Sequence, residues 1–69
     1  MNERADSVVA QVRDRRKTLG LKQQELADLA GCSARFVHTV EAGKETVRLD
    51  KLRDLLDVLG LELRVEARR

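Results

Sequence analysis

Apolar residues recur at steps of three and four along most of this 69-residue chain, which is the spacing of one face of an α-helix. The pattern predicts four helices, over residues 7–19, 23–30, 33–42 and 49–59. The last segment has the strongest apolar stripe, formed by Leu49, Leu52, Leu55, Leu56 and Leu59. Asp6 or Ser7 can cap the first helix at its N-terminus, and Ser33 can cap the third.

The end of the chain has a different period. Residues 61–66 alternate apolar and charged side chains at every position, which predicts a half-buried β-strand. A strand needs a hydrogen-bonding neighbour and the chain has no second strand pattern, so the simplest partner is the same strand of a second copy across a two-fold axis. The apolar face of that dimer interface is Leu61, Leu63 and Val65. The alternatives are a frayed tail or an extended segment lying on the helix at 49–59.

The chain has few residues from which to build a core. Phe36 is its one aromatic residue, and 42% of its residues are apolar. A chain of this size buries about 60% of its unfolded surface, so oligomerisation is expected to supply further burial. We predict a single all-α domain over residues 1–69. Its parts are a helical core at 7–60, a dimerisation strand at 61–66 and a tail at 67–69.

Several classes of protein do not fit this sequence. No apolar run is long enough to span a membrane, and the N-terminus lacks the pattern of a signal peptide. One Cys cannot form an internal disulfide and suits a reducing cytoplasm. One Cys and one His do not make a zinc site, and no catalytic triad, Walker loop or dinucleotide fingerprint is present. We expect a cytoplasmic protein that is not an enzyme and binds no metal or cofactor.

The charge balance alone does not identify a partner. Lys and Arg number 14 and Asp and Glu number 12, which gives a net charge of +2. The basic residues of the first helix gather at Arg13, Arg15, Arg16 and Lys17. Such a cluster can contact phosphates, or it can be a solvated helix face of mixed charge.

Residues 23–42 form a unit of two short helices joined by a turn. Ala27 supplies a small residue where the two backbones meet, and Gly31 tolerates the positive φ that the turn needs. The apolar residues that lock the helices together are Leu26, Ala30, Cys32, Val37 and Val40. This pattern predicts a helix-turn-helix, whose second helix enters the major groove of DNA. Phe36 belongs either to the core or to the edge that meets the DNA backbone.

The resemblance to a known family rests on the motifs GLKQQELA at 20–27, AGCS at 30–33 and VEAGK at 40–44. With these motifs the chain resembles the Cro/C1-type (XRE) helix-turn-helix family over residues 8–60. The further motifs GKETVRLD at 43–50 and LGLEL at 59–63 are similar to the HipB-like antitoxin subgroup. The resemblance implies a lambda-repressor-like fold of four helices, with a C-terminal β-strand that pairs across a homodimer.

The resemblance also implies roles for individual residues. Gln23 opens the second helix, where the matching Gln binds a backbone phosphate. The residues expected to face base edges are Ser33, Ala34, Arg35 and Thr39. Arg35 is the best reader among them, because a guanidinium can bind guanine O6 and N7 together. The other residues that the resemblance places at DNA phosphates are His38, Lys44 and Arg48. The alternative for His38 is an exposed side chain without a DNA contact. Lys22 is also expected at a phosphate, although the resemblance does not imply this contact.

Arg16 and Glu41 match the buried ion pair of the family, and Arg16 lies in an apolar stripe that would not tolerate a free charge. We therefore expect a structural role for this pair. Two positions depart from the family pattern. Lys22 stands where a Ser or Thr usually caps the helix, and Ala34 stands where relatives often have a Gln that reads adenine. The operator sequence therefore cannot be predicted.

The sequence thus predicts a transcriptional repressor that binds a pseudo-palindromic operator on double-stranded DNA as a homodimer. The HipB-like resemblance implies an antitoxin that neutralises a HipA-like kinase toxin and represses its own operon. One alternative is a stand-alone regulator of the XRE type. Another is a protein-interaction module that keeps the helix-turn-helix scaffold without base readout, which Ala34 and the modest net charge would suit.

Overall fold

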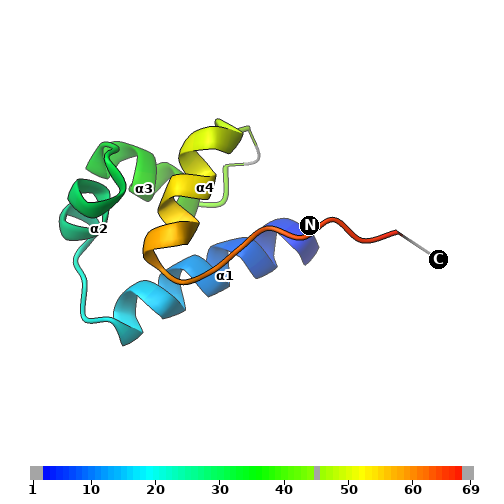
Figure 1. Ribbon diagram of the computed structural model, residues 1–69, viewed down its shortest axis with the longest axis horizontal. Helices are drawn as coiled ribbons and strands as arrows, with labels where there is room; N and C mark the ends of the chain where they lie inside the picture. The colour runs from blue at the N-terminus through cyan, green and yellow to red at the C-terminus, as the bar shows by residue number, and fades with distance from the viewer. Residues whose placement is uncertain (1–2, 45, 68–69) are drawn as a thin grey trace.

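The chain folds into four α-helices, whose order is shown in Figure 1, over the residues that the structure describes. That structure is a computed structural model covering residues 3–44 and 46–67, with the side chains of residues 8–44 and 46–67. The bounds are Glu3–Thr18 for α1, Gln23–Ala30 for α2, Ala34–Glu41 for α3 and Leu49–Val58 for α4. The prediction of an all-α architecture is confirmed, and α2, α3 and α4 begin and end within one residue of the predicted positions.

The first helix is longer than predicted at its N-terminal end. It begins at Glu3 rather than at residue 7, so Asp6 and Ser7 lie inside it and the predicted cap at these residues is wrong. The apolar stripe that located the helix starts only at Val8. Residues 3–5 are Glu, Arg and Ala, which have high helix propensity and extend the helix beyond the part that packs.

The turn between α2 and α3 has the geometry that the sequence predicts. Gly31 adopts a left-handed conformation with φ of 71°, and its N–H donates to the carbonyl of Ala27. Ser33 then caps α3, because its Oγ accepts a 3.1 Å hydrogen bond from the N–H of Phe36. These two caps end one helix and start the next within three residues, which fixes the direction of α3.

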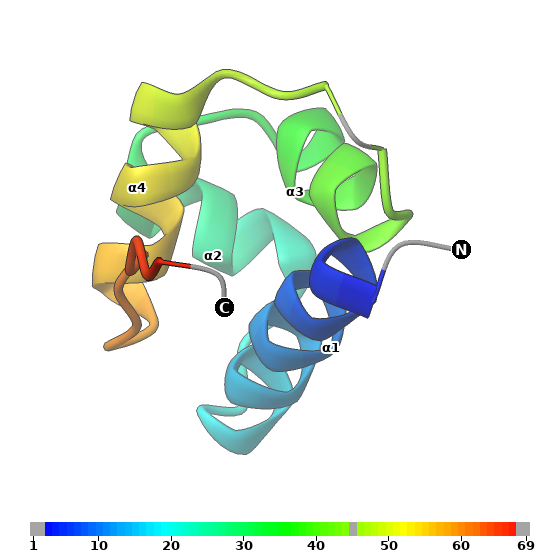
Figure 2. The same cartoon turned by 90° about the vertical axis from the view of Figure 1, so that its right-hand side faces the viewer.

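A single aliphatic core holds the four helices together. Figure 2 shows α2 between α3 and α4, and α2 packs against both while α1 packs against α3. The buried apolar side chains are Val12, Leu26, Ala27, Val37, Val40, Leu52, Leu55, Leu56 and Leu59. Phe36 and Cys32 are half-buried and pack against this cluster. None of the described helices is long and apolar enough to cross a membrane.

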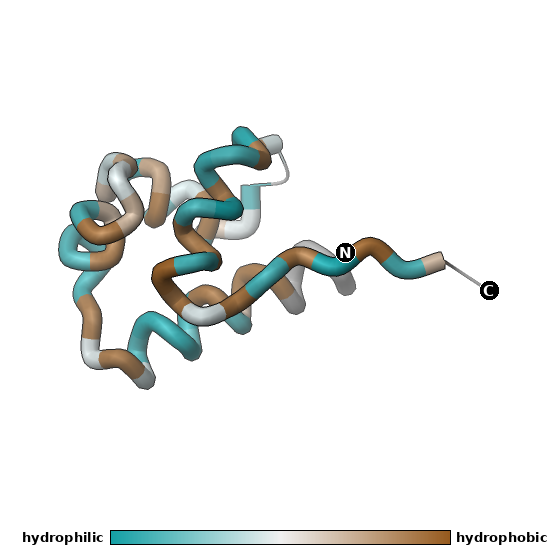
Figure 3. The backbone as a smooth tube through the Cα atoms, in the orientation of Figure 1, coloured by the Kyte–Doolittle hydropathy of each residue, from teal (hydrophilic) through white to brown (hydrophobic). Residues whose placement is uncertain are grey.

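The segment after α4 does not form the predicted strand. Residues 61–67 are neither helix nor strand, and no β-strand occurs among the residues that the structure describes. One copy of the chain has no second strand that could supply the hydrogen bonds. The segment leaves α4 and extends past the helices (Figure 1), with apolar and polar residues alternating along it (Figure 3). Residues 68–69 of the predicted tail lie outside the described residues.

Candidate nucleic-acid interface

Helix α3 presents a polar face to solvent and an apolar face to the core. Val37 and Val40 are buried on one side, while Arg35 and His38 are exposed on the other. Ser33, at the N-terminal end, is also exposed, and its hydroxyl can still donate while its oxygen caps the helix. Three of the expected DNA contacts therefore lie on or beside one accessible helix face, together with the half-buried Thr39.

Besides Ser33, two further residues expected to read bases are partly occupied by contacts within the chain. The hydroxyl of Thr39 donates a 2.8 Å hydrogen bond to the carbonyl of Arg35, one turn earlier in the helix. Its oxygen and its methyl group remain for contacts outside the chain. Ala34 is half-buried and packs against the core, so it offers a base edge only part of a methyl group.

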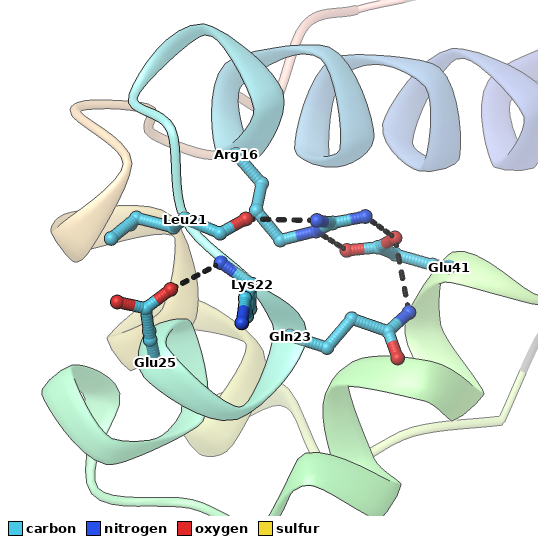
Figure 4. A network of polar contacts seen from close by, with 6 residues as sticks. All are labelled: Arg16, Leu21, Lys22, Gln23, Glu25 and Glu41. Carbon is cyan, nitrogen blue, oxygen red and sulfur yellow. Dashed lines mark hydrogen bonds and ion pairs between the residues drawn. The ribbon is translucent and has the colours of Figure 1, made fainter.

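An ion pair joins α1 to the end of α3, as Figure 4 shows. The guanidinium of Arg16 binds the Glu41 carboxylate through two bonds, Nε to Oε2 at 2.7 Å and Nη2 to Oε1 at 2.8 Å. Its Nη1 donates to the carbonyl of Leu21 at 2.9 Å. The two side chains are only 13% and 5% exposed. Arg16 is therefore committed to the scaffold and is not available to a phosphate.

The electrostatics of Glu41 follow from this arrangement. Burial alone would raise the pKa of Glu41, but hydrogen bonds from Arg16 and Gln23 and the charges of Arg16 and Arg13 together lower it below its ordinary value. The pKa of Arg16 is raised, chiefly by its hydrogen bond to Glu41 and against the effect of burial. Both groups are thus held in their charged forms at neutral pH.

Gln23 extends this network toward the N-terminus of α2. Its Nε2 donates to Oε1 of Glu41 at 3.3 Å (Figure 4), a contact that the sequence did not reveal. An amide group has two N–H donors and one acceptor oxygen, so the bond to Glu41 orients the side chain and leaves a second donor. The amide is therefore held at the helix end where the backbone N–H groups also favour an anion.

Lys22, which precedes Gln23, occupies the N-cap position without capping the helix through its side chain. Glu25 compensates, because its Oε1 accepts a 2.9 Å hydrogen bond from the backbone N–H of Lys22. Of the two hydrogen bonds in a capping box, the one from the N-cap backbone N–H to the Glu side chain is therefore present, although the usual Ser or Thr is absent. The exposed ammonium of Lys22 remains beside the α2 N-terminus.

A small pocket of about 170 Å³ brings several of these groups together between α1, α2 and α3. It is lined by Arg13, Arg16, Gln23, His38, Glu41 and Ala42. Gln23 and His38, both expected at phosphates, therefore share one site with Arg13. The sequence left the role of Arg13 open within its basic cluster, because only the packing of α1 against α3 decides which of those residues reaches this site.

The basic cluster of α1 divides in the structure according to helix face. Arg15 donates from Nε to the carbonyl of Leu59 at 3.0 Å, which ties α1 to the end of α4. Arg16 is held by Glu41, as described above. Arg13 and Lys17 are the two members that remain exposed. Two of the four residues, Arg15 and Arg16, therefore have structural roles. The sequence alone could not distinguish them from the two exposed residues.

The remaining expected phosphate contacts lie between α3 and α4. Lys44 is exposed just beyond α3. Arg48 is the N-cap residue of α4, and its guanidinium binds Asp50 with Nη2 to Oδ2 at 2.7 Å and Nε to Oδ1 at 3.1 Å. That hydrogen bond is the main cause of the lowered pKa of Asp50. Both side chains are more than half exposed, so the pair can open toward another anion.

Comparison with known proteins agrees with this geometry. The sequence pattern of the helix-turn-helix domain family matches residues 7–69. The chain belongs to the helix-turn-helix domain family. A relative of this helix-turn-helix protein is described as an uncharacterised HTH-type transcriptional regulator, y4mF, from Sinorhizobium fredii (strain NBRC 101917 / NGR234). The two are 41% identical over 58 residues, which cover 84% of the chain and 76% of the relative.

Membership places the helix-turn-helix chain among DNA-binding transcriptional regulators and not among enzymes, as the sequence predicts. The candidate interface is accordingly made of two parts. The exposed face of α3 carries Arg35 and His38, and the N-terminal end of α2 carries Gln23 and Lys22. These two parts lie on consecutive elements whose relative direction is fixed by the Gly31 turn.

Proposed function

We propose that this protein is a transcriptional repressor that binds a pseudo-palindromic operator as a homodimer, with α3 in the major groove. The observation that carries the proposal is the division of α3 into a buried apolar face and an exposed polar face directly after a capped turn. An α-helix fits the major groove, and residues near its N-terminus contact base edges in helix-turn-helix proteins.

Arg35 is the residue proposed to lead base recognition. It lies one residue beyond the first residue of α3, is exposed, and has no side-chain hydrogen bond among the described contacts. A guanidinium can donate two parallel hydrogen bonds to guanine. Ser33, Thr39 and the exposed part of Ala34 are proposed as neighbouring contacts, through hydroxyl groups and through methyl groups that can touch thymine.

The proposed phosphate contacts surround this helix and set its register on DNA. Gln23 and Lys22 bind one phosphate at the α2 N-terminus, where His38 lines the same pocket as Gln23. Lys44 and Arg48 bind a second region, after Arg48 exchanges Asp50 for a phosphate oxygen. This exchange costs little, because water and salt screen an ion pair whose two side chains are both more than half exposed.

A direct test measures binding of fluorescent fragments from the protein's own promoter region against a scrambled fragment over a series of salt concentrations. Arg35→Ala is expected to weaken binding to the specific fragment by about tenfold to a hundredfold, equivalent to one bidentate base contact. Arg35→Lys is the matched control, because it keeps the charge and loses the planar fork. We expect it to keep scrambled-fragment binding and lose most of the discrimination.

The test also separates this function from a protein-interaction module on the same scaffold. A module without base readout would show weak binding without steep salt dependence, and neither substitution at Arg35 would change the preference between fragments. Such a result would overturn the repressor proposal. Specific binding without repression of a reporter would retain DNA recognition and reject only the repressor role.

We propose further that the protein acts as an antitoxin for a HipA-like kinase toxin and represses the operon that encodes both. Support comes from the HipB-like motifs at residues 43–50 and 59–63. The alternative is a regulator that acts alone. Coexpression with the product of a neighbouring kinase-like reading frame tests this: the antitoxin role requires a stable complex and restored growth, and a toxin that remains active and unbound contradicts it.

A further inference from the structure

The alternating segment after α4 has two faces that are both self-complementary. We infer that residues 61–66 pair with the same residues of a second copy in a single antiparallel register, with Leu63 opposite Leu63 on the two-fold axis. This inference rests on the homodimer proposed above and specifies its interface.

The C-terminal segment and α4 together line an open groove in which most of the side chains are apolar. Its volume is about 410 Å³. Its apolar lining residues are Leu49, Leu56, Leu61, Leu63 and Val65, and the charged residues Arg53, Asp57 and Glu62 also line it. Leu49 is 61% exposed, Leu63 is 42% exposed and Val65 is fully exposed. Three large apolar side chains along one groove form a surface of the kind that marks a protein interface.

The apolar face decides whether the two-fold axis passes through a residue or between two residues. In an antiparallel pair, directly opposite residues lie on the same face of the sheet. If two neighbouring residues such as Leu63 and Arg64 were opposite each other, apolar side chains would meet charged ones along the whole pair. The two-fold axis must therefore pass through a residue position, so that each apolar residue meets an apolar one.

The two-fold axis could pass through any residue from 62 to 65. Repulsion between like charges excludes two of these four positions. An axis at Arg64 places Arg64 opposite Arg64 of the partner subunit and Glu62 opposite Glu66 of the partner subunit, twice over. An axis at Glu62 places two Glu62 side chains opposite each other. Like charges directly opposite each other destabilise a strand pair.

With the axis at Leu63, every residue from 61 to 65 lies opposite a residue of matching character, apolar opposite apolar and acidic opposite basic. Glu62 meets Arg64 of the partner subunit in two symmetric pairs, and Leu61 meets Val65 of the partner subunit in two more. Leu63 meets itself at the centre. All three apolar residues of each chain are then covered, and both charged positions have an opposite partner.

An axis at Val65 is the nearest competitor. It also pairs opposite charges, because Arg64 then meets Glu66 of the partner subunit. However, it places Leu63 opposite Ala67 and moves Leu61 away from any apolar partner within the strand. It therefore buries less apolar surface than the Leu63 axis, which decides between the two.

In the single chain, Glu62 and Arg64 are already on the same side of the segment, as this pairing requires. Nε of Arg64 lies 3.5 Å from Oε1 of Glu62 in the same chain, so the two charged side chains point to the same side of the segment. Both are 75% exposed. Pairing with a second copy replaces the one contact within each chain by two symmetric contacts between the chains, without turning either side chain to a new face.

Disulfide trapping in the full-length protein tests the register. The background variant Cys32→Ala removes the native thiol, and Leu61→Cys, Leu63→Cys and Val65→Cys are added one at a time. With oxidised glutathione, Leu63→Cys should form a covalent dimer at least about tenfold faster than the other two, because its thiols are directly opposite. The two thiols of the Leu61→Cys dimer would lie about 13 Å apart along the strands, beyond disulfide reach.

A mixture of the Leu61→Cys and Val65→Cys proteins supplies the matched control, since their thiols should form a mixed disulfide that neither protein forms alone. Rapid cross-linking of Val65→Cys alone, with slow cross-linking of Leu63→Cys, would overturn the Leu63 register and leave the homodimer intact. A wild-type chain that sediments as a monomer at all accessible concentrations would overturn the homodimer as well.

Charge exchange supplies a second measurement that does not alter the apolar face. Glu62→Arg or Arg64→Glu alone creates two like-charge pairs in the Leu63 register. Each is expected to raise the dimer dissociation constant by about threefold to thirtyfold in sedimentation equilibrium. The double variant should return it to within about threefold of the wild-type value. In a Val65 register the double variant still places the new carboxylate at position 64 opposite Glu66 of the partner subunit, so failure of this rescue would reject the Leu63 register.

Discussion

Arg16 and Glu41 show what one pair of residues contributes to this fold. A guanidinium that donates to two carboxylate oxygens and one carbonyl leaves no charge without a partner in a site where both side chains are almost completely buried. Removing one partner leaves the other charge buried, which costs more than the intact pair contributes. The pair therefore acts as a fixed joint between α1 and α3, the helix proposed to read DNA.

Glu41→Ala should consequently destabilise the protein by about 3–5 kcal/mol. Chemical denaturation followed by circular dichroism measures the change. Asp50→Ala is the control, since it removes an ion pair whose side chains are more than half exposed, and it should change the free energy of unfolding far less than Glu41→Ala does. Equal effects of the two substitutions would contradict a buried structural role for Glu41.

The lowered pKa of Glu41 also predicts how stability varies with pH. The folded state holds a proton on this carboxyl less tightly than the unfolded state does, so the stabilisation is complete above the ordinary Glu pKa of about 4.3. It is lost progressively as the pH falls from there through the lower pKa of the folded state. Denaturation midpoints measured between neutral and acidic pH should show this loss, and Glu41→Gln should lack this component.

At the scale of the element, the turn between α2 and α3 depends on one backbone conformation. Gly31 has φ of 71°, and a Cβ placed there would meet nothing within 4 Å. Gly31→Ala should therefore be destabilising through backbone strain alone, by about 1 kcal/mol. Gly31→Asn should cost less, because Asn tolerates the left-handed region. Thermal unfolding measures both, and an Ala variant as stable as the wild type would contradict the strain argument.

The helices were the most predictable feature of the fold, because each one that packs carries a continuous apolar stripe. The start of α1 was not, since residues 3–5 extend the helix through propensity and carry no stripe. The pairing of Arg16 with Glu41 could also be predicted from the sequence, whereas the other contacts that orient the candidate site could not. The Arg15 bond to Leu59 and the Gln23 bond to Glu41 join elements 44 and 18 residues apart, and only packing reveals them.

At the scale of the whole molecule, the proposed binding to two half-sites of an operator requires a second copy of the chain. The helices of a single copy are closed around one core, while Leu49, Leu63 and Val65 remain exposed beside the C-terminal segment. Successive major grooves on one side of B-DNA lie about 34 Å apart, farther than a single α3 of eight residues can span. Dimerisation through residues 61–66 would meet both needs, since it covers the exposed apolar groove and supplies a second α3.

The salt dependence of operator binding tests this connection between assembly and function. Lys22, Lys44 and Arg48 give three proposed cationic phosphate contacts in each subunit, or six in a dimer, for which the slope of log K against log salt is about −5. A chain without residues 61–69 should sediment as a monomer and bind with a slope of about −3. Lys44→Ala in the full-length protein removes one contact from each subunit and should make the slope less steep by about 2. If the truncated chain still sedimented as a dimer, or kept the full slope, the two half-sites would have to be joined through another surface.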